Sequence, residues 1–203
     1  MKDMIKNTLV LLIITVVAGA ILGLVYQTTK DTIAAREEAD KKAAYLEVFN
    51  DASDFVPVAD FMDAAKRNIL DEAGYAAGNI DELLTAVDSA NASLGYVFII
   101  TTSEGYGGNI QFAVGVRNDG TVNGISILSI NETAGLGMNA EKVLKPQFAN
   151  KNVSLFSYTK TGATTDSEID AISGATITTN AFTNGVNCAL TYFNNVLGGG
   201  NNE

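Results

Sequence analysis

Residues 170–178 carry the side chains best suited to covalent chemistry. They read Asp-Ala-Ile-Ser-Gly-Ala-Thr-Ile-Thr and precede an apolar pattern typical of a helix. Gly174 and Ala175 leave little bulk around the hydroxyl of Thr176, and the free N–H groups at a helix start stabilise an anion. Thr178 offers a second hydroxyl. The stretch therefore suits a phosphoester on Thr176, the alternative being an ordinary turn and helix cap.

The same residues fit the pattern Asp-x-x-(Ser/Thr)-Gly-Ala-Thr-x-(Ser/Thr), so the chain resembles the FMN-binding domain family. In that family, the threonine that directly follows Gly-Ala carries FMN as a phosphoester. The resemblance implies covalent FMN on Thr176. The rest of the flavinylation motif is then Asp170, Ser173, Gly174, Ala175 and Thr178.

Two further stretches resemble the family. Residues 132–137 read Glu-Thr-Ala-Gly-Leu-Gly, where the family loop against the flavin ring has Pro in place of Ala134, and residues 105–108 read Gly-Tyr-Gly-Gly. Lys145 is a weaker candidate for a contact with the flavin or its phosphate. The resemblance implies these cofactor-binding residues: Glu132, Thr133, Gly135, Leu136, Tyr106 and Lys145.

Two other stretches match a binding motif without its full context. Gly162-Ala163-Thr164 repeats the Gly-Ala-Thr triplet but has Tyr158 where the motif needs Asp, so we interpret Thr164 as unmodified. Residues 135–140 fit the dinucleotide pattern Gly-x-Gly-x-x-Ala, but no parallel βαβ context is apparent, which argues against an NAD site.

Composition removes several kinds of chemistry. The chain has 203 residues, no histidine, a single cysteine (Cys188, expected to be buried and inert) and a formal net charge of −10. This excludes a Ser-His-Asp triad, an intrachain disulfide and a cysteine-ligated cluster, and argues against nucleic-acid binding. We expect no catalytic or metal-binding residue, and any redox chemistry to belong to a cofactor.

The N-terminal region predicts one membrane helix. Residues 7–29 carry no charge and are long enough to span a bilayer, whereas a cleaved signal peptide would have a shorter apolar region. Basic residues lie on both sides, so charge alone leaves the orientation open. We expect a single pass through the cell (inner) membrane with the C-terminal domain extracytoplasmic.

The remaining pattern predicts an α+β fold with a twisted antiparallel sheet flanked by helices. We expect a cytoplasmic tip and transmembrane helix over 1–29, a helical stalk and connecting segment over 30–93, and the FMN-binding core over 94–203. The expected helices are 30–49, 58–72, 140–150 (capped by Asn139 and interrupted near Pro146) and 177–196, while 81–88 is left open between helix and loop. The expected strands are 96–102, 110–117, 122–130, with an Asp-Gly hairpin at 118–121, and 153–158.

At this length the chain resembles the RnfG branch of the family, and NqrC proteins are similar. The resemblance implies an electron carrier in an Rnf-type complex that couples ferredoxin–NAD electron transfer to Na⁺ or H⁺ translocation, with no substrate turnover of its own. It implies other membrane subunits and an ApbE-type flavin transferase as partners, beside the lipid bilayer. The alternatives are an NqrC-like protein, a domain that binds FMN reversibly, and a pilin-like structural protein without a cofactor.

Overall fold

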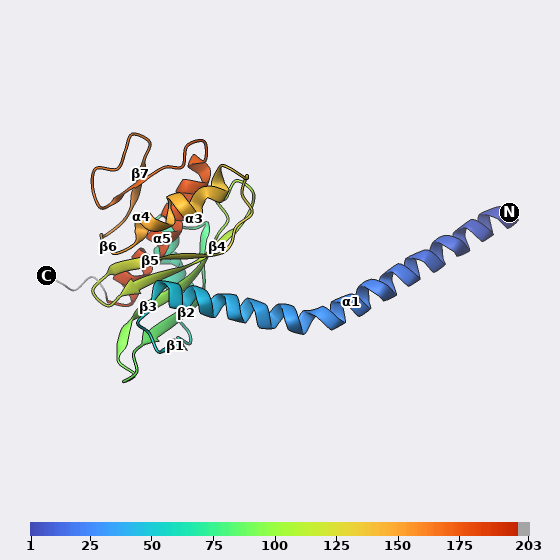
Figure 1. The fold of residues 1–203 in the computed structure, drawn as a ribbon, viewed down its shortest axis with the longest axis horizontal. Coiled ribbons are helices and arrows are strands. Elements are labelled where there is room, and N and C mark those ends of the chain that lie inside the picture. Colours follow the sequence, from blue (N-terminus) through green and yellow to red (C-terminus); the bar gives the residue numbers. More distant parts are fainter. Residues whose placement is uncertain (199–203) are drawn as a thin grey trace. The chain divides into compact units, whose positions relative to one another are not determined.

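The computed structural model describes residues 1–198 (Figure 1). The chain divides into two compact units, residues 1–42 and the residues from Ala43 onward. The elements are α1 (Lys2–Val48), β1 (Asp54–Pro57), α2 (Ala64–Glu72), β2 (Gly78–Val87), β3 (Ser93–Thr102), β4 (Ile110–Arg117), β5 (Thr121–Ser129), a 3₁₀ turn η1 (Gly137–Asn139), α3 (Ala140–Val143), α4 (Lys145–Phe148), β6 (Lys151–Asn152), β7 (Ser157–Thr159), β8 (Glu168–Asp170) and α5 (Thr176–Val196).

The first unit is the N-terminal part of α1. Among the described residues, α1 is the helix long and apolar enough to cross a membrane, and its most apolar window has no buried residue. Its threonine hydroxyls bond within the helix: Thr8 Oγ1 donates to Met4 O and Thr15 Oγ1 to Leu11 O, each at 2.9 Å. Internal bonding of this kind lets a helix face lipid, because the bilayer interior offers no water as a partner.

The second unit is built on a six-stranded sheet with the order β1-β2-β3-β4-β5-β6, antiparallel at every pair. β7 and β8 form a separate parallel pair. The predicted α+β class with an antiparallel sheet is confirmed. The Asp-Gly hairpin also forms, with Gly120 at φ +84° and its N–H donating to Arg117 O at 2.9 Å.

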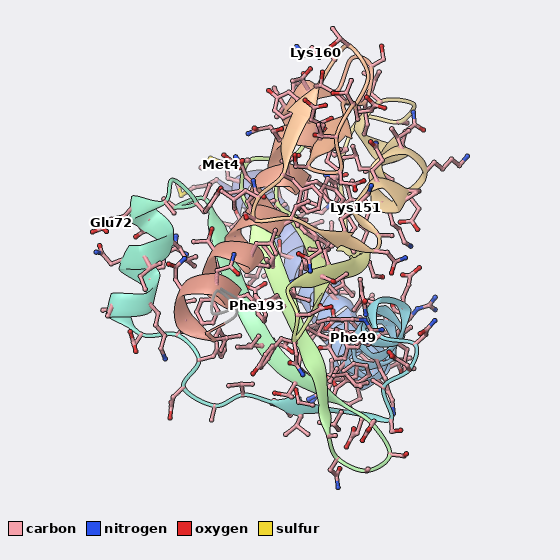
Figure 2. All side chains as sticks on the ribbon, turned by 90° about the vertical axis from the view of Figure 1, so that its left-hand side faces the viewer. Met4, Phe49, Glu72, Lys151, Lys160 and Phe193 are labelled. Carbon is pink, nitrogen blue, oxygen red and sulfur yellow. The ribbon has the colours of Figure 1, made fainter. Side chains whose placement is uncertain are left out.

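Both faces of this sheet are buried, in two separate cores. β3 shows why, because Phe98 and Ile100 point to one face while Val97 and Ile99 point to the other, and all four are 0% exposed. On the first face α5 packs across β2, β3 and β4 (Figure 1). Figure 2 labels one aromatic residue from each core, Phe193 and Phe49.

The end of α1 covers the second face. Ala44, Tyr45, Val48 and Phe49 are buried there, and Asn123 Nδ2 donates to the Val48 carbonyl at 2.8 Å, which satisfies a helix-end acceptor. The predicted stalk is therefore helical, but its last turns are part of the domain core rather than a solvated spacer.

Two more expectations for the segment before residue 94 differ from the structure. Residues 81–88, left open between helix and loop, lie mostly in β2, because pairing with both β1 and β3 supplies hydrogen bonds that no local pattern reveals. The helix expected from Val58 begins at Ala64, where Asp63 Oδ1 accepts from Lys66 N at 2.9 Å. The sheet thus starts well before the expected core at residues 94–203.

Two expectations nearer the C-terminus were also wrong in detail. Asn139 does not cap the next helix: its side-chain Nδ2 donates to Gly135 O at 2.7 Å, and the segment splits into η1, α3 and α4. Residues 153–158 form no continuous strand, because the side chain of Asn187 bonds both the N–H and the C=O of Phe156, at 2.7 and 2.8 Å. The C-terminal helix 177–196 is confirmed as α5.

A close approach of α5 to the sheet yields the first prediction. A methyl group added at Gly185 would lie 2.5 Å from Phe112 Cζ. Although alanine favours a helix by about 1 kcal/mol, overpacking costs about 1–3 kcal/mol. We expect Gly185→Ala to lower the thermal unfolding midpoint of the full chain in detergent, followed by circular dichroism. Asn195→Ala, at an exposed position of the same helix, is the control, and an unchanged midpoint for Gly185→Ala would contradict the packing.

The buried thiol yields the second prediction. Cys188 is 0% exposed, and burial raises the pKa of its thiol to about 12. The thiol therefore stays protonated near neutral pH, and the thiolate is the reactive form. We expect the native chain at a pH of about 8 to be inert to a disulfide reagent and to react with one equivalent after denaturation. Fast labelling of the native chain would show that α5 does not seal this position.

Candidate functional site

A cleft of about 480 Å³ lies where the three sequence motifs meet. This volume falls in the range of roughly 300–1,000 Å³ that is usual for small-molecule sites. Tyr106 comes from the turn after β3, residues 132–137 from the loop after β5, and residues 174–178 from the start of α5. The lining residues are Tyr106, Glu132, Thr133, Leu136, Gly137, Gly174, Ala175, Thr176, Ile177 and Thr178.

The carboxylate of Glu132 connects all three segments. Its Oε2 accepts from Thr178 Oγ1 at 3.0 Å, and its Oε1 accepts from the Gly107 N–H at 3.2 Å. Thr178 is buried in the first turn of α5, two residues after Thr176. One side chain from the β5 loop thus holds both the Gly-Tyr-Gly-Gly turn and the helix start.

Three glycines make room for this arrangement. A methyl group at Gly137 would lie 2.6 Å from Thr178 Oγ1 and 2.7 Å from Glu132 Oε2. At Gly105 it would overlap the Gly108 carbonyl oxygen and lie 2.9 Å from Glu132 Oε1, and at Gly107 it would overlap the Asn131 carbonyl oxygen. At Gly105, Gly107 and Gly137 a larger residue would therefore collide with Glu132, Thr178 or the backbone of the two loops.

Two tight turns of the same kind border the cleft. In one, Leu136 N donates to Thr133 O at 3.1 Å with Gly135 at φ +78°; in the other, Ala175 N donates to Ile172 O at 3.0 Å with Gly174 at φ +76°. A positive φ at the third turn residue is what a type II turn requires. Proline is common at the second position of such turns, yet Ala134 serves there, so the loop closes without the family's proline.

Sequence reasoning missed Thr179, which fixes the turn before Thr176. Its buried Oγ1 donates to Ala175 O at 3.0 Å and accepts from Ile172 N at 3.1 Å. The signal was present as a second threonine directly after Thr178. Because this hydroxyl bridges the turn and the helix, the path of the backbone into Thr176 is fixed from within the core.

Thr176 itself stands at the first position of α5 and is partly exposed in the cleft. The preceding Ala175 offers no side-chain cap. The first N–H groups of a helix have no intrahelical acceptor, so this end favours an anionic ligand. The N–H groups at the start of α5, the partly exposed hydroxyl of Thr176 and the partly apolar lining of the cleft all fit a phosphate joined to a planar aromatic ring.

The remaining motif residues lie elsewhere or make no lining contact. Asp170 does not line the cleft: its Oδ1 accepts from Ala163 N at 2.5 Å, which ties β8 to the loop that holds the second Gly-Ala-Thr triplet. Ser173 is exposed. Lys160 lies in that same loop between β7 and β8, at the top of Figure 2.

Thr164, in the second Gly-Ala-Thr triplet, does not line the cleft, and its N–H and its hydroxyl both have a hydrogen-bond partner. Its N–H and its hydroxyl both donate to Glu168 Oε2, at 2.7 and 2.8 Å. The backbone bond is the main cause that lowers the pKa of Glu168, and the hydroxyl bond adds to it. The two Gly-Ala-Thr triplets therefore stand in different surroundings, one at the start of a long helix and the other in a loop.

Lys145 is not brought to the cleft. Its ammonium group pairs with Glu47 and Glu141, each at 2.5 Å. Burial works against its charge, but the hydrogen bonds to Glu141 and Glu47 outweigh burial and raise the pKa of Lys145. This lysine therefore ties the end of α1 to α3 and α4.

The dinucleotide pattern at 135–140 has no dinucleotide context. The sheet beside it is antiparallel, and the helix that follows, α3, has only four residues. Over residues 1–198, no group of three or more His, Cys, Asp or Glu side chains gathers in a way that could hold a metal ion.

Comparison with known proteins gives matches over nearly the whole chain. Residues 105–191 match the FMN-binding domain family, and residues 1–48 match the RnfG N-terminal region. The chain is 33% identical over 201 residues to the G subunit of the Na⁺-translocating ferredoxin:NAD⁺ oxidoreductase complex of Acetobacterium woodii, covering 96% of this chain and 94% of that protein. It is 33% identical over 184 residues to the proton-translocating counterpart of Clostridium ljungdahlii, covering 90% and 88%. For the G subunit of the ion-translocating oxidoreductase complex of Methanosarcina acetivorans, the identity is 30% over 193 residues, covering 94% and 95%.

Two solved structures were also matched. NqrC of Shewanella oneidensis gives a TM-score of 0.47 at 18% identity, covering 58% of this chain and 61% of that chain. The C subunit of the Na⁺-translocating NADH-quinone reductase of Parabacteroides distasonis gives 0.46 at 18% identity, covering 70% and 76%.

The glycine contacts yield the third prediction. In Gly137→Ala the added methyl group must displace Thr178 or Glu132, so we expect the cleft to lose the bond between them and the chain to be destabilised by about 1–3 kcal/mol. Chemical denaturation of the full chain in detergent measures the free energy of unfolding. Met138→Ala, at the exposed neighbouring position, is the control. Equal stability of Gly137→Ala and wild type would contradict the tight packing around Glu132.

Proposed function

Because the chain belongs to the family of G subunits of ion-translocating oxidoreductase complexes, we propose that it is a membrane-anchored electron carrier that holds FMN as a phosphoester on Thr176. One observation carries the proposal. Thr176 stands at the first position of a long helix and lines a cleft that the other two family motifs complete.

The chain's own residues would hold the cofactor in distinct ways. The N–H groups at the start of α5 suit the phosphate, since a preorganised helix end stabilises that charge without a lysine or arginine. Leu136, Ile177 and Tyr106 present exposed apolar surface at the rim, which suits a planar aromatic ring. Glu132 and Thr178 supply the polar floor.

FMN supplies one-electron and two-electron redox chemistry when bound. The chain contributes attachment, orientation and partial exclusion of water. This division matches the composition, since a chain without histidine and with one buried cysteine has no redox-active or strongly basic side chain suited to this task. We therefore expect no turnover of a substrate by the isolated chain.

The setting of this carrier follows from the relatives. Their names describe ferredoxin:NAD⁺ oxidoreductase complexes that translocate Na⁺ or protons. We propose that this chain relays electrons in such a complex beside other membrane subunits, which hold the ferredoxin and NAD sites. α1 anchors it by a single pass, with the FMN-binding domain on the extracytoplasmic side, where a covalent bond keeps the cofactor from being lost.

Attachment requires help. An unassisted threonine hydroxyl is a weak nucleophile, and no histidine exists to serve as its base. We propose that an ApbE-type flavin transferase, with Mg²⁺, moves FMN from FAD onto Thr176. The hydroxyl oxygen forms a bond to the FMN phosphorus while the diphosphate bond of FAD breaks, AMP leaves, and the transferase takes up the hydroxyl proton. An NqrC-like role in a sodium-pumping quinone reductase is the second candidate. Reversible FMN binding and a pilin-like structural role are the interpretations that a mass measurement separates from covalent attachment.

The fourth prediction tests the covalent bond. The full chain is co-expressed with a transferase, purified in detergent and denatured before intact mass measurement. We expect wild type to gain the mass of one FMN less one water. Thr176→Val should lose this gain completely, because valine keeps the shape of threonine without the hydroxyl.

Thr164→Val is the matched control, since it alters the same triplet in the loop between β7 and β8 and should keep the full mass gain. Flavin that leaves the wild-type chain on denaturation would favour reversible binding. Absence of any flavin, with the transferase active on another acceptor, would favour a structural role. A gain that survives Thr176→Val would refute the assigned position.

A further inference from the structure

We propose that Glu132 is the positioning residue of flavin attachment: it presents the Thr176 hydroxyl to the transferase by holding the first turn of α5 against the β3–β4 turn. The inference rests on the proposed function and extends it, because neither the family match nor the flavinylation motif assigns this task to a residue outside 170–178. It commits to hydrogen-bond geometry, rather than to negative charge, as what Glu132 provides.

The geometry comes first. The two carboxylate oxygens of Glu132 face two different segments, Thr178 Oγ1 at 3.0 Å and Gly107 N at 3.2 Å. Thr178 lies two residues after Thr176 in the same helical turn. Any movement of Thr178 therefore moves the backbone that carries the reactive hydroxyl.

The packing around the Glu132 carboxylate indicates that the surrounding loops are shaped to hold it. A methyl group added at Gly105 would overlap the Gly108 carbonyl oxygen and lie 2.9 Å from Glu132 Oε1, and one at Gly137 would lie 2.6 Å from Thr178 Oγ1 and 2.7 Å from Glu132 Oε2. Two separate loops thus leave space for one side chain. Thr178 is 1% exposed, so its hydroxyl has little access to water, and the hydrogen bond that it makes here is the one to Glu132 Oε2.

The other side chains near the start of α5 do not join its cleft side to the loops of the sheet. Thr179 fixes the turn from Ile172 to Ala175 from the core side. Ala175 supplies no side-chain cap, and Asp170 bonds the loop at Ala163 instead of α5. Among the described residues, Glu132 is therefore the side chain that ties the cleft side of the first helical turn to the loops of the sheet.

A positioning role predicts a loss in the rate of the chemical step. A misplaced nucleophile slows a reaction without weakening the docking of the protein substrate, and a displacement of about 1 Å can cost about 100-fold. For transfer of FMN to this chain, we expect Glu132→Ala to lower the transferase kcat by about 10- to 100-fold while the KM for the chain stays within about threefold.

Glutamine separates geometry from charge. Its Oε1 can accept from Gly107 N while its Nε2 donates to Thr178 Oγ1, so the bond to Thr178 reverses its direction but both contacts remain without the negative charge. We expect Glu132→Gln to keep kcat within about threefold of wild type, and Thr178→Val, which removes the hydroxyl partner, to slow the reaction as Glu132→Ala does. The double variant with Glu132→Ala and Thr178→Val should be no slower than the slower of the two single variants. The reason is that both substitutions remove the same hydrogen bond, the one between Glu132 and Thr178.

The fifth prediction is therefore a kinetic comparison of these variants as full chains in detergent, at a temperature where circular dichroism shows each one folded. Asp81→Ala is the control: Asp81 also accepts a threonine hydroxyl, from Thr101 at 2.6 Å, but lies on β2 and does not line the cleft. It should leave kcat unchanged. Even if Glu132→Ala does not fold, Glu132→Gln and Thr178→Val decide the matter.

The outcomes are distinct. A wild-type chain that gains no flavin contradicts the proposed function itself. A wild-type chain that is modified while Thr178→Val reacts at the wild-type rate overturns only the role of Glu132. A Glu132→Gln chain as slow as Glu132→Ala would show that the charge matters rather than the geometry, and so would also overturn the inference.

Discussion

The double-sided burial of the central strands is the constraint on which this domain depends. Residues 97–100 of β3 are 0% exposed, so each face of the sheet needs a cover. α5 covers one face and the last turns of α1 cover the other. Burial of each large apolar side chain contributes about 1.5–3 kcal/mol, so neither cover is dispensable in a domain of this size. The end of the anchor helix is consequently part of the fold and not an attachment to it.

Placement of α5 in turn creates the site. Gly185 lets α5 approach Phe112 closely. The N-terminus of α5 therefore lies beside the strand ends from which the loops after β3 and β5 leave the sheet. The glycines of these loops admit the Glu132 carboxylate and the Asn131 carbonyl oxygen without a side chain in the way. The cleft is thus a consequence of helix packing. The glycines of its sequence motifs give the loop backbone the room that this packing requires.

The chemistry of the chain is consistent with a carrier. A hydroxyl at a helix start, a polar floor and an apolar rim attach and orient a ligand, and the described lining residues include no histidine or lysine that would serve as a general base. The charges that the domain does pair, such as Lys145 with Glu47 and Glu141, hold the end of α1 to α3 and α4. The hydrogen bonds around the partly exposed Thr176 fit the proposal that a cofactor is attached there.

The sequence by itself determined the features that rest on local chemistry. These are the apolar anchor, the Asp-Gly hairpin, the final helix and the motif around Thr176, because composition, periodicity and turn residues act over a few positions. It also kept the second Gly-Ala-Thr triplet apart from the first, on the identity of flanking residues. Ala134 shows the limit of motif matching, since the loop closes through Gly135 without the expected proline.

Only the tertiary structure decided what depends on distant partners. Residues 81–88 lie mostly in a strand because β1 and β3 flank them, and Phe156 leaves the strand pattern because Asn187, 31 positions away, takes its backbone bonds. Likewise, Lys145 turned to Glu47 rather than to the cleft, and Asp170 to Ala163. The bond between Glu132 and Thr178 spans 46 positions, and such a contact becomes visible only once the sheet has brought its two loops to the start of α5.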